Sequence, residues 1–186
     1  MKLGVILVKI LKNKMKSDLN IRTEKDFPKK GIEFIDITPL FLQKETLKEM
    51  NDLFKKEIKK KEADYIVGPE ARGFLLGSAL ASSLNIGFIP VRKKGKLPPT
   101  TVAATANYTK EYGDDVLELP KLVKDSYKNK KFYLVDDIYA TGNTMNAIKN
   151  CIESLGGKVV GEGVILNIVE LNDKKDLFSI IDVNEE

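Results

Sequence analysis

Two adjacent carboxylates and a loop of small residues stand close together in the chain. Asp136 and Asp137 close a short apolar run, and a small, hydroxyl-rich loop follows shortly after them. The loop consists of Ala140, Thr141, Gly142, Asn143 and Thr144. Backbone N–H groups in such a loop, and at a helix start behind it, attract phosphate, and threonine hydroxyls add donors. The carboxylates suit the hydroxyls of a ribose and a Mg²⁺ ion carried by the ligand. The chemistry predicted is therefore the binding of a phosphorylated sugar.

These side chains need a strand before them and a helix after them. Residues 132–135 are apolar and rich in β-branched and aromatic types, which predicts a buried strand. A helix is predicted after the loop, because apolar residues recur at a spacing that places them on one helical face. They are Met145, Ile148, Cys151, Ile152 and Leu155. A plain strand, turn and helix with exposed acids is the alternative. A Walker-type loop fits poorly, because no Gly-Lys-Ser or Gly-Lys-Thr ends the loop.

Residues 135–144, Val-Asp-Asp-Ile-Tyr-Ala-Thr-Gly-Asn-Thr, resemble the phosphoribosyl-pyrophosphate motif of type I phosphoribosyltransferases. The resemblance implies that residues 140–144 bind the 5′-phosphate and that Asp136 and Asp137 hold the ribose. It also implies Mg²⁺ as the cofactor. That ion would be carried by the substrate near the two aspartates, so direct protein ligands are not expected.

A second informative segment, residues 26–40, is predicted to be a short extended piece between turns. Pro28, Gly31 and Pro39 bracket it, and apolar and polar residues alternate inside it. The apolar residues of this alternation are Ile32, Phe34 and Ile37, and the polar residues are Glu33 and Asp36. A plain structural loop is the alternative to a functional segment.

The same segment resembles the base-binding segment of adenine phosphoribosyltransferases. The resemblance implies that Phe34 stacks on the purine and that main-chain groups of Glu33 and Ile35 bond the purine edge. The family usually has arginine where this chain has Ile35. Residues 26–42 are accordingly predicted to be the base-binding part of a small hood.

Four cations follow predicted strands. Arg72 comes after residues 64–68, and Arg92, Lys93 and Lys96 come after residues 87–91. Ligands bind beyond the carboxyl ends of strands in an α/β sheet, although a solvated loop is the ordinary alternative. The resemblance assigns all four side chains to pyrophosphate. It also implies that the first cation of the second loop completes a neighbouring subunit's site, and hence a homodimer.

Residues 98–114 are predicted to form a flexible catalytic loop. Positions 100–107 are small or polar and show neither a helical nor a strong strand pattern, and long loops in compact domains are often lids. Glu111-Tyr-Gly matches the family's mobile loop, which implies that Glu111 is the catalytic acid–base group. The chain contains no histidine that could take this role.

Composition fits a soluble globular domain. The 186 residues are 42% hydrophobic and 31% charged. The net charge of +4 is mild and no run is basic enough to predict nucleic-acid binding, nor is any apolar run long enough for a membrane span. Cys151 is the single cysteine, which excludes a disulfide framework and favours a reducing, cytoplasmic location.

Strands alternating with helices predict an α/β fold with a mainly parallel sheet and helices on both faces. The resemblance specifies the type I phosphoribosyltransferase fold, with a hood from the N-terminal segment, as a single domain over residues 1–186. Within residues 1–25, an extension precedes a short helix that Ser17 caps and that runs to about Glu24. Residues 1–11 are open to three interpretations: a strand, a helix, or an extension before a natural start at Met15.

The activity that the resemblance implies is transfer of the 5-phosphoribosyl group from phosphoribosyl pyrophosphate to adenine, giving AMP and pyrophosphate. One alternative is a phosphoribosyltransferase for another purine. The other is a regulator that keeps the phosphoribosyl-pyrophosphate site but binds nucleic acid or a partner. A regulator would need a further DNA-binding domain or basic face and no catalytic loop, so the enzyme is favoured.

Overall fold

A computed structural model describes residues 8–27, 29–31, 33–110 and 113–185 of the chain. Within these ranges the strands form one eight-stranded sheet, in the order β1-β10-β9-β8-β4-β5-β7-β6, and a separate pair, β2-β3. The strands are β1 Val8–Asn13, β2 Arg22–Lys25, β3 Glu33–Asp36, β4 Tyr65–Pro69, β5 Gly87–Lys93, β6 Val102–Lys110, β7 Gly113–Pro120, β8 Lys131–Tyr139, β9 Lys158–Ile168 and β10 Leu177–Glu185. The α-helices are α1 Thr38–Leu42, α2 Lys44–Lys59, α3 Arg72–Leu84 and α4 Asn143–Ser154.

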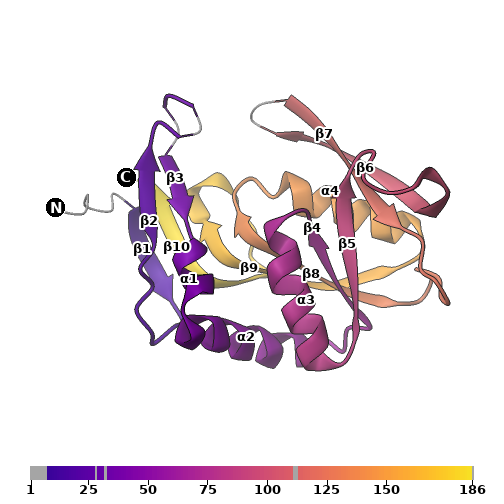
Figure 1. The fold of residues 1–186 in the computed structure, drawn as a ribbon, viewed down its shortest axis with the longest axis horizontal. Coiled ribbons are helices and arrows are strands. Elements are labelled where there is room, and N and C mark those ends of the chain that lie inside the picture. Colours follow the sequence, from indigo (N-terminus) through magenta and orange to yellow (C-terminus); the bar gives the residue numbers. More distant parts are fainter. Residues whose placement is uncertain (1–7, 28, 32, 111–112, 186) are drawn as a thin grey trace.

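The centre of the large sheet is parallel and its edges are antiparallel. Strands β10, β9, β8, β4 and β5 run in one direction, whereas β1 at one edge and β7 and β6 at the other pair antiparallel with their neighbours (Figure 1). The carboxyl ends of β4, β5 and β8 therefore meet at one edge, where the predicted site segments begin. The predicted mainly parallel α/β fold is confirmed.

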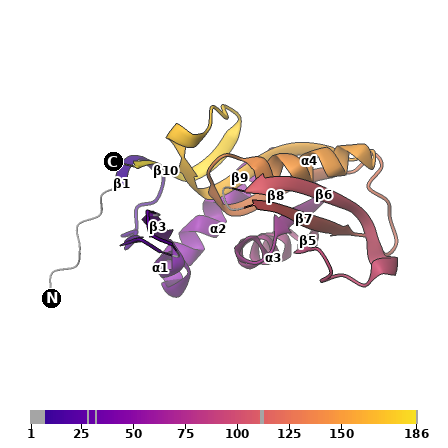
Figure 2. The same ribbon diagram turned by 90° about the horizontal axis from the view of Figure 1, so that it is seen from above.

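Helices cover both faces of the sheet, with α2 and α3 on one side and α4 on the other (Figure 2). Successive side chains of β8 point to opposite faces of the sheet, and both faces are covered, so β8 needs apolar residues at successive positions. Phe132 and Leu134 pack with the buried side chains of α4, whereas Tyr133 and Val135 pack with those of α2 and α3. A strand that is buried on both faces must be apolar at successive positions.

The first described residues, Val8–Asn13, form strand β1. β1 lies antiparallel to β10, with Val8 opposite Glu185 and Asn13 opposite Ile181, so the last strand of the parallel sheet is not the sheet edge. Of the three interpretations left open for residues 1–11, the strand is the one that the described part, residues 8–11, adopts.

The short helix predicted from Ser17 to Glu24 is wrong. Asn20 has φ +47°, which lies outside the right-handed helical region, and Ile21 is buried in the core. From Arg22 onward the chain is strand β2, which pairs antiparallel with β3 from Arg22↔Asp36 to Lys25↔Glu33. Local helix propensity was outweighed by pairing with β3, which supplies backbone hydrogen bonds, although the side chains of β2 are mostly exposed. The β2–β3 pair is the hood.

The segment predicted as an irregular loop is mostly a β-hairpin. After the 3₁₀ helix η1 (Pro99–Thr101), β6 pairs with β7 from Val102↔Pro120 to Lys110↔Gly113. Small side chains gave no strand signal, but Ala106 is buried in the core below this ribbon. The hairpin and the hood rise from the same side of the sheet (Figure 1). Glu111, the predicted catalytic residue, lies outside the described residues.

None of the helices in the described ranges is long and apolar enough to cross a membrane.

Candidate functional site

The small loop after β8 forms a cavity at the start of α4. Buried residues of β8 lead to the loop, Gly142 takes the position just before the helix with φ +78°, and α4 begins at Asn143. A cavity of about 110 Å³ is lined by Asp136 and by residues 138–145, which include all five predicted phosphate-loop residues. A helix start that faces a small hollow is an arrangement that attracts phosphate, so this cavity is the candidate phosphate site.

Gly142 permits a close approach that another residue would block. A Cβ atom at this position would lie 2.1 Å from the hydroxyl oxygen and 2.4 Å from Cζ of Tyr139. Tyr139 is only 2% exposed, because its ring packs in the core under α4, so it has little room to move. Sequence analysis did not single out this tyrosine, which forms the floor of the loop.

We therefore expect Gly142→Ala to displace the loop. The φ of +78° and the contact with Tyr139 both oppose the new methyl group. Affinity for ribose 5-phosphate should fall about tenfold or more, the effect of losing one or two charge-assisted hydrogen bonds. Gly156→Ala is the control: Gly156 has φ +82°, but its Cβ would meet Lys128 only at 3.4 Å. Calorimetric titration giving equal affinities for the two variants would contradict this role of Gly142.

The carboxylate pair lies at the end of β8 in different environments. Asp137 is 5% exposed, and its Oδ2 lies 2.7 Å from Nε of Arg72 at the start of α3. The two atoms form an ion pair by distance, yet this buried oxygen accepts no aligned hydrogen bond from the described residues. It can still accept a hydroxyl donor from a ligand. Oδ1 of Asp136 accepts the backbone N–H of Asp137 at 2.9 Å.

Burial, and then the adjacent charge of Asp137, raise the pKa of the Asp136 carboxyl well above its ordinary value. The folded protein therefore holds this proton more tightly than the unfolded chain does. Stability should fall as pH rises from the unfolded pKa, about 3.9, through the raised folded pKa, because ionisation then opposes folding. Within this window the Asp136 carboxyl is already ionised in the unfolded chain but still protonated in the folded protein.

We expect Asp136→Asn to remove this pH dependence. The free energy of unfolding of this variant, measured in urea, should increase relative to that of the parent as pH rises through the window. Above the window the difference between the two proteins should stay constant. Asp52→Asn should behave oppositely, because the hydrogen bond from Lys48 lowers the pKa of exposed Asp52, so that carboxylate favours the folded state at neutral pH. A constant difference between Asp136→Asn and the parent at every pH would show that Asp136 ionises normally.

Arg72 connects the carboxylates to the hood. Its guanidinium carbon lies 6.0 Å from the ring centroid of Phe34 on β3, so three segments distant in the chain meet here. The Phe34 ring is half-buried and stands edge-to-face with Phe27 at 5.1 Å. Ile35 is 4% exposed and its side chain packs in the core. The structure thus brings together the predicted base, ribose and phosphate residues.

The other predicted cations are arranged differently. Nε of Arg92 donates to Oε2 of Glu70 at 2.9 Å, and the backbone N–H of Lys93 donates to the same oxygen at 3.1 Å. The side chains of Lys93 and Lys96 are exposed to solvent. Glu70, to which sequence analysis gave no role, therefore ties the end of β5 to the turn that leads into α3 and Arg72.

The described residues do not contain a complete metal site. No group of three or more His, Cys, Asp or Glu side chains in these ranges could hold an ion. Mg²⁺ is usually bound by one or two carboxylates together with substrate phosphates and water. Asp136 and Asp137 supply that number of carboxylates, so the residues present fit an ion that arrives with the substrate.

Comparison with known proteins supports a single family. The phosphoribosyl transferase domain model matches residues 39–183. The adenine phosphoribosyltransferase of Clostridium acetobutylicum is 45% identical over 159 residues, which is 85% of this chain and 90% of the relative. That of Brachyspira hyodysenteriae is 46% identical over 158 residues, which is 84% of this chain and 90% of the relative.

Solved structures agree with these sequence relatives. The adenine phosphoribosyltransferase of Thermoanaerobacter pseudethanolicus superposes with a TM-score of 0.79 at 39% identity, covering 87% of this chain and 95% of the other. The enzyme of Saccharomyces cerevisiae, solved with adenine and an imino-altritol bisphosphate, has a TM-score of 0.77 at 33% identity. That match covers 87% of this chain and 94% of the other.

Proposed function

Because the chain belongs to the adenine phosphoribosyltransferase family of the phosphoribosyl transferases, we propose that it carries out that family's purine-salvage reaction. It transfers the 5-phosphoribosyl group from phosphoribosyl pyrophosphate to adenine, giving AMP and pyrophosphate. The observation that carries this function is the juxtaposition of the cavity at residues 140–144, the Asp137–Arg72 pair and the Phe34 ring. In this proposal they serve as a phosphate site, a ribose site and an aromatic platform, and Arg72 links the last two.

Residues 140–144 hold the 5′-phosphate in this proposal, and Asp136 and Asp137 hold the ribose hydroxyls. The buried Oδ2 of Asp137, which accepts no aligned hydrogen bond among the described residues, supports the second assignment. A ribose hydroxyl would supply the missing donor, and hydrogen bonds to charged acceptors are the strong ones. Arg72 would exchange its contact with Asp137 for one with pyrophosphate as the substrate binds.

In the chemical step, positive charge develops on the ribose ring and negative charge on the departing pyrophosphate. The bond from the anomeric carbon to pyrophosphate breaks and carries its electron pair to the leaving oxygen, and N9 of adenine forms the new bond from the other face. The carboxylates favour the positive ring, and the departing charge is stabilised by Arg72, Arg92, Lys93 and Lys96. Mg²⁺ bound with the substrate would supply further neutralisation of the pyrophosphate. Glu111 takes the proton that adenine loses.

The hood reads the base. Phe34 offers a half-buried ring for stacking. Glu33 and Ile35 lie two residues apart on β3, so their main-chain groups face the same edge of the strand. The proposed reading of the purine edge by these groups does not use the Ile35 side chain, which packs in the core.

The test of the function is product formation. The parent protein, supplied with adenine, phosphoribosyl pyrophosphate and Mg²⁺, should release AMP and pyrophosphate in equal amounts. Omission of Mg²⁺, with a chelator present, should abolish turnover. Binding of phosphoribosyl pyrophosphate without turnover of adenine, hypoxanthine or guanine would instead favour a regulator.

A homodimer and a cytoplasmic location complete the proposal. Cys151, the single cysteine, is buried on α4, which suits a reducing compartment. The dimer follows from the family's use of the residue matching Arg92 in a neighbouring site. Here Arg92 is paired with Glu70, which lies just before α3, so it would have to leave Glu70 to enter a neighbour's site.

Mixing two inactive variants tests the shared site. We expect Arg92→Ala and Asp137→Ala chains, unfolded and refolded together, to recover some activity. A mixed dimer holds one site with its own Asp137 and the partner's Arg92. Each variant refolded alone is the control and should stay inactive. A fully active monomer in sedimentation, or no recovery in verified mixed dimers, would refute sharing.

A further inference from the structure

Asn172 lies beside the phosphate loop, although it is distant from that loop in the chain. It follows the 3₁₀ helix η2 (Val169–Leu171) and begins the crossover from β9 to β10. Its amide Nδ2 lies 3.0 Å from the carbonyl oxygen of Ala140, 3.0 Å from Oδ1 of Asn167 and 2.9 Å from the carbonyl oxygen of Ile168. Its own Oδ1 accepts the backbone N–H of Lys174 at 3.2 Å. One side chain therefore links the loop, the end of β9 and the crossover.

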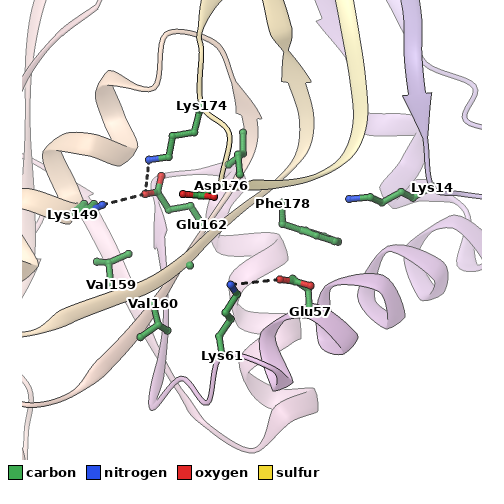
Figure 3. A pocket seen from close by; sticks show the side chains of 12 residues that line it. Lys14, Glu57, Lys61, Lys149, Val159, Val160, Glu162, Lys174, Asp176 and Phe178 are labelled. Carbon is green, nitrogen blue, oxygen red and sulfur yellow. Dashed lines mark hydrogen bonds and ion pairs between the residues drawn. The ribbon is translucent and has the colours of Figure 1, made fainter.

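Asn172 is itself firmly held. Its partner Asn167 is 8% exposed, and Nδ2 of Asn167 donates to Asp182 on β10 at 3.3 Å. Two residues further along the crossover, Lys174 donates to Glu162 of β9 at 2.8 Å. Figure 3 shows Lys174 and Lys149 both directed at Glu162, in a pocket of about 510 Å³. The crossover is thus fixed to β9 on both sides of its first turn.

The contact between Asn172 and the carbonyl oxygen of Ala140 fixes the orientation of the peptide group that joins Ala140 to Thr141. In a trans peptide the C=O of Ala140 and the N–H of Thr141 point in opposite directions. Asn172 accordingly directs the Thr141 N–H to the side of the peptide away from itself. The phosphate cavity is lined by Ala140 and Thr141 but not by Asn172. The tether also keeps the carbonyl oxygen of Ala140 from turning toward an anion.

We propose that Asn172 is a positioning residue, which orients the Ala140–Thr141 peptide for binding of the 5′-phosphate. The inference rests on the proposed function of this cavity. Asparagine suits the role because it offers two N–H donors and one carbonyl acceptor. Aspartate has the same shape but no donor, so it would place a charged oxygen against two carbonyl oxygens and Oδ1 of Asn167.

The test compares a ligand that carries the phosphate with one that lacks it. Calorimetry gives the dissociation constants of AMP and adenosine for each variant, and their ratio measures the contribution of the phosphate. Partial unfolding scales both apparent constants equally and cancels in the ratio. Asn172→Asp should lower the ratio of the adenosine constant to the AMP constant about tenfold or more, the effect of one charge-assisted hydrogen bond.

Two further variants complete the design. Asn172→Ala removes the donors without adding charge and should lower the ratio by about threefold to tenfold, so the inference stays testable where the aspartate variant does not fold. Asn150→Asp, at an exposed position on α4, adds the same charge and should leave the ratio unchanged. A parental ratio maintained in both Asn172 variants would overturn the role of Asn172. A parent that binds AMP no better than adenosine would overturn the phosphate cavity itself.

Discussion

Glu111→Gln should lower kcat by roughly 100-fold or more, because a positioned general acid–base group typically contributes about 10²–10⁴-fold. Adenine must lose a proton as it becomes a nucleotide base, and the chain has no histidine to accept it. Glu111 stands in sequence between β6 and β7, whose ribbon rises on the same side of the sheet as the hood. Glutamine keeps the size of the side chain and removes only its basicity.

Steady-state kinetics with saturating substrates measures this effect, and thermal unfolding checks that the fold is intact. Glu153→Gln is the matched control, since Glu153 is exposed near the end of α4 and loses the same charge. The control should retain parental kcat. A Glu111→Gln enzyme within about threefold of the parent, far less than the loss of a general base, would remove Glu111 from the mechanism.

Selectivity for adenine over hypoxanthine and guanine should reach roughly 10⁴-fold in kcat/KM, as sites built on buried hydrogen bonds achieve against mismatched analogues. In the proposed recognition of the base, a backbone C=O accepts from the 6-amino group of adenine, and a backbone N–H donates to N1. Hypoxanthine and guanine present an oxygen at position 6 and a proton on N1, so both contacts become repulsive. Residues 33–35 of β3 provide such main-chain groups beside the Phe34 ring.

Two substitutions at Ile35 test whether the base is recognised by the Ile35 side chain or by main-chain groups. Ile35→Val should leave the selectivity unchanged and cost about 0.5–1.5 kcal/mol of stability, because Ile35 is a core residue. Ile35→Arg would restore the residue usual in the family, but it would place a charge at a buried position and should destabilise the hood. Selectivity of the parent below about tenfold, far under the expected discrimination, would instead favour the alternative purine reaction.

The strand, loop and helix around the candidate phosphate cavity were predictable because their signals are local. The apolar run 132–135, the small loop and the apolar face of α4 are each contained in a few successive residues. Each pattern is imposed by the layers directly next to the element, so the spacing of apolar residues indicates which element forms. That the side chains of β8 divide between two cores was visible only in the structure.

The two mistaken elements depended on partners that local patterns do not contain. Residues 17–24 have enough polar spacing to suggest a helix, but pairing with β3 makes part of them a strand. Residues 100–107 have side chains too small to show a strand period, yet the chain pairs with β7 from Val102 onward. Strand β1 needs β10, which lies at the other end of the chain.

By itself, the sequence determined the fold class and which residues are candidates for the site, through residue types and their order after strand ends. Only the tertiary structure decided which of them touch. Arg72 meets Asp137 and Phe34, whereas Arg92 pairs with Glu70, and Asn172, after β9 and η2, reaches Ala140. The reason is physical: an ion pair or hydrogen bond depends on the direction of each side chain and on how the layers pack. Spacing along the chain carries neither.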